Sequence, residues 1–312
     1  MYHDYDLKKV MDHIKTTPKK KFILDTDTAN EIDDQFAVTF ATVLDDIDLL
    51  ALNAAPFVND ESESPAEGME KSYEELLRLR GHIDPENKRG IPCYRGSTKK
   101  MDNVISPVRS EAAENIVRIV KEADDIVYVG VIGCYTNVAS ALLLDPSIAD
   151  KMVLILIGAG KLDYHCGDTN IFGDVNAARV IFECGVPVIL IPVMYACTEL
   201  IYTTNAELNY YLKDKAGAIG NYLCEIYDRS ERIETDSDCC ISRMRNLVDL
   251  GCIAFLHDPS IFSYRYIPSR STSADYYWFE LNDGRSMIYV DELKRNRIMT
   301  EFFQNLRKYT NK

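Results

Sequence analysis

Short apolar runs alternate with amphipathic segments over most of this chain, and few folds accommodate that order. Runs of this length resemble strands buried on both faces of a parallel sheet, and the segments between them have the period of helices. The runs are Phe22–Leu24, Ile47–Ala55, Ile126–Ile132, Met152–Ile157 and Val186–Val193, and the helical segments are Asp33–Leu44, Ser64–Arg80, Glu111–Ala123, Thr136–Leu144 and Asn176–Cys184. This alternation predicts an α/β fold, with an open, mainly parallel twisted sheet flanked by helices.

The last third of the chain departs from this pattern. Ala206–Tyr227 has a helical period, the sequence then becomes rich in tyrosine, and a basic helix is predicted near Glu292–Lys308. No linker or low-complexity tract separates this part from the rest. We therefore predict an N-terminal helical extension over residues 1–20 and one α/β domain over residues 21–312, with an elaborated C-terminal third.

Charge and cysteine content narrow the possible partners and surroundings. Asp and Glu number 49 against 35 Lys and Arg, and the net charge of −14 would repel nucleic acid and anionic membranes. The nine cysteines include no CxxC pair and are typical of reduced thiols. The N-terminus lacks a signal-like apolar stretch, and no apolar run approaches about 18 residues. These features predict a cytoplasmic protein.

An acidic cluster follows the first predicted strand. Five carboxylates fall within ten residues, namely Asp25, Asp27, Glu31, Asp33 and Asp34. Crowded carboxylates raise one another's pKa unless a cation neutralises them, and an all-oxygen ligand set favours calcium or magnesium over zinc. A simpler interpretation is an acidic loop in which Asp33 and Asp34 stabilise the next helix. For a whole cluster at a strand's carboxyl end, where open parallel sheets bind ligands, we predict a metal site.

This opening resembles two enzyme families. The segment from Phe22 to Thr28 resembles the strand-DxDxT opening of haloacid dehalogenase-type phosphatases, which implies Asp25 as a phosphorylated nucleophile and Asp27 as a general acid. It is also similar to the DTDxxxxDD opening of the inosine-uridine-preferring nucleoside hydrolases. The phosphatase pattern needs a second acidic pair after a late strand, whereas here Asp33 and Asp34 follow at once. The nucleoside hydrolase is the leading hypothesis and the phosphatase the alternative.

Three later segments resemble the nucleoside hydrolases in the order that the family has them. They are Gly133-Cys-Tyr-Thr136-Asn137-Val-Ala, similar to GPLTNVA; Asp168-Thr-Asn170-Ile-Phe-Gly-Asp174-Val-Asn-Ala-Ala, similar to EFNxxxDPEAA; and His257-Asp258-Pro259, similar to HDP. Asn59, after the second strand, is a weaker match. Each segment alone has a structural interpretation, as a helix cap, a turn or an ordinary His–Asp pair. Together they extend the resemblance over roughly residues 20–262.

The resemblance implies calcium-dependent hydrolysis of the N-glycosidic bond of ribonucleosides, giving ribose and free base. It assigns calcium ligation to Asp27, Asp34, Asp258 and the Thr136 carbonyl, activation of water to Asp33, sugar contacts to Asn59, Asp168 and Asn170, polarisation of the leaving base to His257, and a supporting position to Asp25. It also implies a small-molecule nucleoside substrate and a homodimer or homotetramer.

Three departures from the family pattern bear on activity. Asn30 and Glu31 lengthen the aspartate loop by two residues, Asp168 is one methylene shorter than the family glutamate, and Leu162 stands where an asparagine is expected near the 5′ side of the ribose. The two inserted residues leave open a third hypothesis, a relative that binds nucleosides or ribose without hydrolysing them. The changes at Asp168 and Leu162 bear on recognition of the 5′-hydroxyl, and the resemblance does not define base preference.

Overall fold

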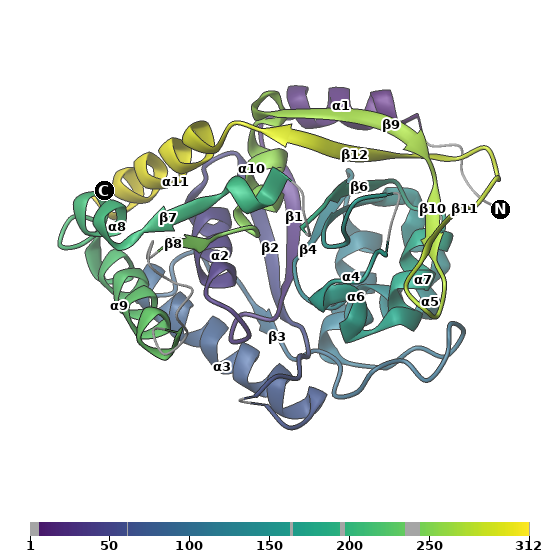
Figure 1. Ribbon diagram of the computed structural model, residues 1–312, viewed down its shortest axis with the longest axis horizontal. Helices are drawn as coiled ribbons and strands as arrows, with labels where there is room; N and C mark the ends of the chain where they lie inside the picture. The colour runs from purple at the N-terminus through teal and green to yellow at the C-terminus, as the bar shows by residue number, and fades with distance from the viewer. Residues whose placement is uncertain (1–5, 61, 163–164, 194–196, 235–243, 312) are drawn as a thin grey trace.

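The computed structural model describes residues 6–60, 62–162, 165–193, 197–234 and 244–311. At its centre lies an eight-stranded sheet with the order β3-β2-β1-β4-β5-β6-β12-β9 (Figure 1). Its strands are β1 Lys20–Thr26, β2 Ile47–Ala54, β3 Cys93–Tyr94, β4 Val127–Val131, β5 Met152–Ile157, β6 Val188–Ile191, β9 Phe262–Pro268 and β12 Ser286–Leu293. Every pairing in this sheet is parallel except that of β12 with β9, so the predicted mainly parallel α/β fold is confirmed.

Helices cover both faces of the sheet, and two short two-stranded sheets complete the chain. The helices are α1 Leu7–Thr16, α2 Asp33–Val43, α3 Pro65–Ile83, α4 Glu111–Glu122, α5 Thr136–Leu144, α6 Thr169–Gly173, α7 Val175–Glu183, α8 Asn205–Tyr211, α9 Gly217–Glu234, α10 Leu250–His257 and α11 Arg295–Thr310. The short strands are β7 Tyr202–Thr204, β8 Met244–Asn246, β10 Arg270–Thr272 and β11 Trp278–Glu280.

Alternation of side chains along β1 explains the two apolar layers. Phe22 and Leu24 point into the layer that includes residues of α2, α10 and α11, whereas Ile23 points into the layer that includes residues of α4, α5 and α7. All three side chains are fully buried, as expected for a central strand with helices on both faces.

The two connections that leave the middle of the sheet diverge between β1 and β4. From β1 the chain proceeds to β2 and β3 on one side, then returns to place β4 on the other side of β1. Such a reversal of strand order opens a crevice at the carboxyl ends of the two strands, which is the usual ligand site of open α/β sheets. The acidic loop after β1 and the segment before α5 both begin here.

The C-terminal third extends the sheet and adds structure around it. β12 pairs with β6, β9 forms the edge, and α1 packs against β12 through an apolar face (Figure 1). The helical pattern predicted over Ala206–Tyr227 is confirmed, and the chain divides there into two helices, α8 and α9. Asp214 and Gly217 have φ values of 58° and 60° in the connecting turn, a left-handed conformation that a continuing helix cannot contain. Among the described helices, none has the length and apolarity to cross a membrane.

Candidate metal and active site

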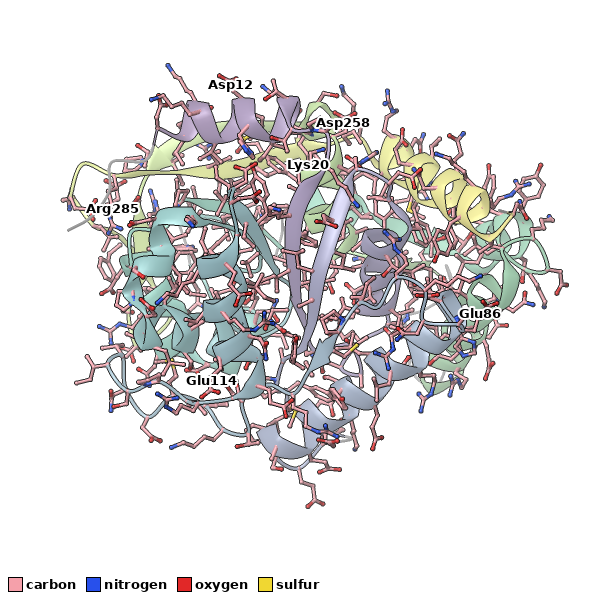
Figure 2. The ribbon with its side chains drawn as sticks, turned by 180° about the vertical axis from the view of Figure 1, so that it is seen from behind. Asp12, Lys20, Glu86, Glu114, Asp258 and Arg285 are labelled. Carbon is pink, nitrogen blue, oxygen red and sulfur yellow. The ribbon has the colours of Figure 1, made fainter. Side chains whose placement is uncertain are left out.

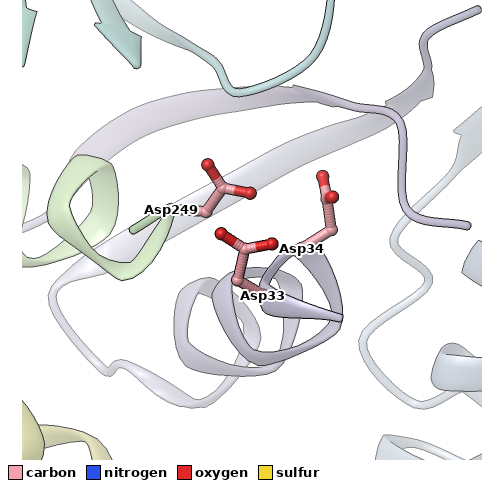
Figure 3. A group of neighbouring side chains, drawn as sticks. All are labelled: Asp33, Asp34 and Asp249. Atoms are coloured by element: carbon pink, nitrogen blue, oxygen red, sulfur yellow. The ribbon is translucent and has the colours of Figure 1, made fainter. Parts of the chain in front are cut away.

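Three buried carboxylates meet beside the β1–β4 crevice. Asp33 and Asp34 are the first two residues of α2, and Asp249 directly precedes α10. One oxygen of each lies within 4.8 Å of the others, and Figure 3 shows the three side chains turned toward a common space. The backbone amides of Val248 and Asp249 also hydrogen-bond with Asp33, which fixes the start of α10 against the start of α2.

Asp27 brings a fourth carboxylate to this cluster from the end of β1. Its side chain is only 4% exposed, and its Oδ2 accepts a hydrogen bond of 2.9 Å from Asn30 Nδ2. A methyl group at Gly133 would lie 2.9 Å from Asp27 Oδ1, so only glycine at that position lets the end of β4 approach this carboxylate. We call Asp27, Asp33, Asp34 and Asp249 the carboxylate cluster.

Burial and repulsion from neighbouring carboxylates, Glu31 among them, raise the pKa of every member of the carboxylate cluster. Burial is the largest cause for each of the four. The charges that add to the pKa of Asp34 and Asp249 belong to other cluster members and to Glu31, all of them acidic. An oxygen-only set of repelling, desolvated carboxylates is the chemistry that a hard divalent cation relieves, so these residues could hold a metal ion.

Asp25 stands behind the cluster and is completely buried. Its Oδ2 accepts a 3.0 Å hydrogen bond from Asn137 Nδ2, and burial raises its pKa to about 7. Asn137 in turn donates to the carbonyl of Ala54 and accepts from the amide of Ser97, at 3.1 Å and 2.7 Å. This network ties together the ends of β1 and β2 and the start of α5. A side chain so enclosed is unsuited to the exposed nucleophile that the phosphatase alternative requires.

Thr136 begins α5 at the carboxyl end of β4, on the other side of the crevice. Its Oγ1 donates a 2.8 Å hydrogen bond to Asp174 Oδ2. Asp174 Oδ2 also accepts a 2.7 Å hydrogen bond from the amide of Met101. Asp174 caps α7 through its other oxygen. The hydroxyl of Thr136 is therefore engaged in fixing this loop, and metal ligation by its carbonyl stays a prediction.

The predicted sugar-binding residues lie around the same crevice. Asn170, on α6, donates from Nδ2 to the carbonyls of Ile132 and Ile157 at 2.9 Å and 3.0 Å. Asp168 caps α6: Oδ1 accepts from the amide of Ile171 at 2.8 Å and Oδ2 from that of Ala159 at 2.6 Å. Burial raises the pKa of Asp168 to about 7. Direct contact of these side chains with a sugar stays a prediction.

Asn59 reaches the site through the lengthened aspartate loop. Its Nδ2 donates to Asn30 Oδ1 at 3.1 Å, and Asn30 in turn donates to Asp27. One of the two inserted residues therefore supports a member of the carboxylate cluster. Beside the carboxylate cluster lies a hollow of about 220 Å³, whose lining includes Asp27, Cys134, Thr169 and Phe172.

The predictions for His257 and Asp258 are wrong, because both residues lie at the amino ends of the parallel strands, opposite to the carboxylate cluster. His257 Nδ1 bonds to Asp46 at 2.9 Å, and Asp46 also accepts a 2.8 Å bond from Lys20, the first residue of β1. Figure 2 shows Asp258 near Lys20. The seven residues of β1 span roughly 20 Å between this amino end and the carboxylate cluster.

Replacing His257 with alanine is expected to lower stability. Hydrogen bonding and charge from Asp46 raise the pKa of this imidazole against the opposing effect of burial. Because the folded protein favours the protonated imidazole, His257 contributes its full stabilisation at pH values below the unfolded pKa of 6.5. This contribution is lost as the pH rises through the pKa of the folded state. His257→Ala should lower the free energy of unfolding by about 1–3 kcal/mol at pH 5.5 and by less at pH 9, measured by urea unfolding. A selective loss of activity on substrates with poor leaving groups, at unchanged stability, would contradict this interpretation.

Asp249 was not predicted from the sequence. The His257-Asp258-Pro259 triplet drew attention because of its resemblance to HDP, although a second aspartate stands eight residues before His257. A usable signal was present: Asp249 directly precedes the apolar run Leu250–Leu256, just as Asp33 and Asp34 precede the apolar run that begins at Phe36. If Asp249 takes the place of the family's aspartate, the preceding residue is Val248 and not histidine.

The parallel sheet and the buried carboxylates at its β1–β4 crevice define an α/β protein with an acidic centre able to hold a divalent cation. The sequence model of the inosine-uridine preferring nucleoside hydrolases matches residues 22–301. The chain therefore belongs to the inosine-uridine preferring nucleoside hydrolase family. It is an enzyme of the N-glycosidase class, a ribonucleoside hydrolase.

Known proteins resemble the chain over nearly its full length. Probable uridine nucleosidase 2 of Arabidopsis thaliana is 24% identical, with 93% of this chain and 88% of that protein covered. The pyrimidine-specific ribonucleoside hydrolase RihA of Escherichia coli O1:K1 / APEC is 23% identical, with coverage of 86% and 93%. A purine-preferring ribonucleoside hydrolase from Gardnerella vaginalis superposes with a TM-score of 0.76 at 20% identity, with coverage of 93% and 99%.

Proposed function

We propose that this protein hydrolyses the N-glycosidic bond of ribonucleosides to ribose and free base, with calcium as its metal ion. The observation that carries the proposal is the burial of four carboxylates together at the β1–β4 crevice. Relatives are named for uridine, pyrimidine and purine substrates, so the proposal extends to ribonucleosides as a class.

Asp27, Asp34, Asp249 and the Thr136 carbonyl would hold the ion. These are hard oxygen donors, which suits calcium better than a transition metal. When bound, the cation would supply positive charge that lowers the pKa of water and attracts the hydroxyls of the sugar. Asp249 takes the place first assigned to Asp258, because it is the carboxylate that shares the space between Asp33 and Asp34.

Asp33 is the proposed general base. The amides of Val248 and Asp249 hydrogen-bond with this carboxylate and hold it in place within the cluster. It accepts a proton from the attacking water while the oxygen of that water bonds to C1′ and the bond from C1′ to the base nitrogen breaks. Asn170 has its amide nitrogen engaged by two carbonyls, so its oxygen remains to accept from a sugar hydroxyl.

An assay of released ribose tests the function. Inosine, adenosine, guanosine, uridine and cytidine are incubated with the protein, with and without a chelator, and calcium or magnesium is then added back. Release that stops with chelator and returns with calcium supports the proposal. Nucleoside binding by calorimetry without ribose release would instead favour the non-hydrolysing relative.

Calcium binding is expected to release protons and to stabilise the fold. The carboxylate cluster has raised pKa values, so part of it is protonated near neutral pH, and a cation displaces those protons. Calorimetry at pH 7 in buffers of different ionisation enthalpy should reveal proton release, and affinity should fall between pH 8 and pH 6. Calcium at 100 times its Kd should add about 2.7 kcal/mol to the free energy of unfolding. Binding without proton release and with equal affinity at both pH values would place the ion elsewhere.

A further inference from the structure

The leaving base needs a partner that the carboxylate cluster does not provide. When the bond from C1′ to the base breaks, its electron pair passes to the base, and a hydrogen-bond donor near that ring stabilises the charge. The residue before Asp249 is Val248, which has no donor side chain, and His257 lies at the opposite edge of the sheet. A donor for the leaving base must therefore come from another residue around the crevice.

His165 stands in an aromatic cluster that adjoins the hollow beside Asp27. Its ring centroid lies 5.8 Å from that of Phe172 and 5.2 Å from that of Tyr277. Phe172 lines the hollow together with Asp27, and this residue is 44% exposed. Phe172 also meets Tyr276 edge to face at 4.6 Å. Phe172 is therefore shared by the hollow and by the aromatic cluster that contains His165.

Backbone contacts fix this aromatic cluster from two directions. The amide of Cys166 donates to the carbonyl of Tyr276 at 2.7 Å, and His165 and Tyr277 form a β-bridge. These contacts join the loop after β5 to the turn of the β10–β11 hairpin, which Figure 1 shows beside α5 and α7. Tyr276 has a φ of 64°, a conformation uncommon for a bulky residue and typical of positions that the surrounding structure holds.

The hydrogen bonding of His165 determines which ring nitrogen carries its proton. The amide of Gly167 donates to Nδ1 at 3.2 Å, so Nδ1 acts as an acceptor and the neutral ring carries hydrogen on Nε2. A methyl group at Gly167 would lie 2.2 Å from the Phe172 ring and 2.7 Å from His165 Cε1, so glycine allows all three groups to meet. The imidazole is thus held as an Nε2–H donor.

We propose that His165 is a catalytic residue whose Nε2–H donates a hydrogen bond to the departing base, which lies along Phe172. This inference rests on the proposed nucleoside hydrolysis. The electron pair of the broken bond goes to the base nitrogen, and the resulting charge is shared with a ring nitrogen or exocyclic oxygen that accepts from His165. The imidazole keeps its proton, since losing it would leave an imidazolate, and the base takes its proton from solvent water.

Two substitutions and two substrates separate this role from others. His165→Leu removes the donor, whereas His165→Gln retains an N–H donor but no titratable group. Each variant is assayed on inosine and uridine, whose bases need help to leave, and on p-nitrophenyl riboside, whose phenolate leaves unaided. His82→Leu and His82→Gln are matched controls, because His82 lies on α3, outside the aromatic cluster of His165. The ring of His82 stacks on that of Tyr222, with the centroids 4.6 Å apart. Thermal unfolding of each variant reports on folding.

We expect His165→Leu to lower kcat/KM for the nucleosides by about 10²-fold and for p-nitrophenyl riboside by much less, with His165→Gln recovering at least tenfold. Equal losses on both substrates would overturn the proposal. So would a glutamine variant as impaired as the leucine variant, since that result would indicate proton transfer. If the leucine variant unfolds, the substrate dependence of the glutamine variant decides. A wild-type protein that cleaves neither substrate would refute nucleoside hydrolysis itself, whereas an active protein indifferent to His165 would refute this inference alone.

Discussion

Asp249→Asn is expected to reduce ribose release by roughly 10³-fold, because a metal centre contributes several kcal/mol of charge stabilisation to the transition state. Asparagine keeps the size of the side chain and removes the negative charge. Among the described residues that could hold a metal ion together, Asp249 belongs to the buried group with Asp33 and Asp34. Calcium affinity, measured by calorimetry, should fall with the rate.

Asp258→Asn is the matched control for this prediction. It makes the same chemical change, but Asp258 caps the turn after α10, where its Oδ1 accepts from the Ser260 amide at 3.0 Å, at the other edge of the sheet. Asparagine caps helices about as well as aspartate, so activity and stability should stay near those of the wild type. A large loss of activity in Asp258→Asn, together with an active Asp249→Asn variant, would indicate that Asp258 and not Asp249 binds the metal ion.

Asp33→Asn is expected to lower kcat by about 10²–10⁴-fold while nucleoside binding stays within a few-fold of the wild type. The amide cannot accept a proton from water, whereas the proposed ligands Asp27, Asp34 and Asp249 remain. Rates come from ribose release at saturating substrate, and binding of nucleoside and of calcium comes from calorimetry. Near-normal kcat would assign the base to another residue, and parallel loss of calcium binding would make Asp33 a ligand.

Stability in the absence of calcium distinguishes these effects from misfolding. Burial and repulsion disfavour the charged forms of Asp33 and Asp249, so removing one charge should leave the cation-free Tm unchanged or higher. An inactive variant with a clearly lower Tm would have lost its fold and not its chemistry. Stabilisation by added calcium should shrink in Asp249→Asn and persist in Asp33→Asn.

Local sequence features were enough for five of the eight strands of the central sheet and for one half of the site. Buried strands need continuous apolar runs. The predicted run Phe22–Leu24 lies within β1, and the predicted run Met152–Ile157 coincides with β5. Asp27, Asp33 and Asp34 are close in sequence and follow one strand, so no long-range contact was needed to group them. Polar residues interrupt the seven residues of β9, and the buried run of β12 is only four residues long, so neither segment was predicted as a strand.

The other half of the site depended on tertiary structure. Asp249 and Asp258 flank the same apolar helix, Asp249 at its start and Asp258 at its end, so their surroundings in the sequence are similar. The eight residues of α10 rise by roughly 12 Å, which places its first residue at the carboxyl edge of the sheet and its last at the amino edge. The sequence by itself determined that carboxylates would gather at a strand end. The direction in which α10 packs across the sheet decided that Asp249 joins them, because a helix brings only one of its ends to a given edge.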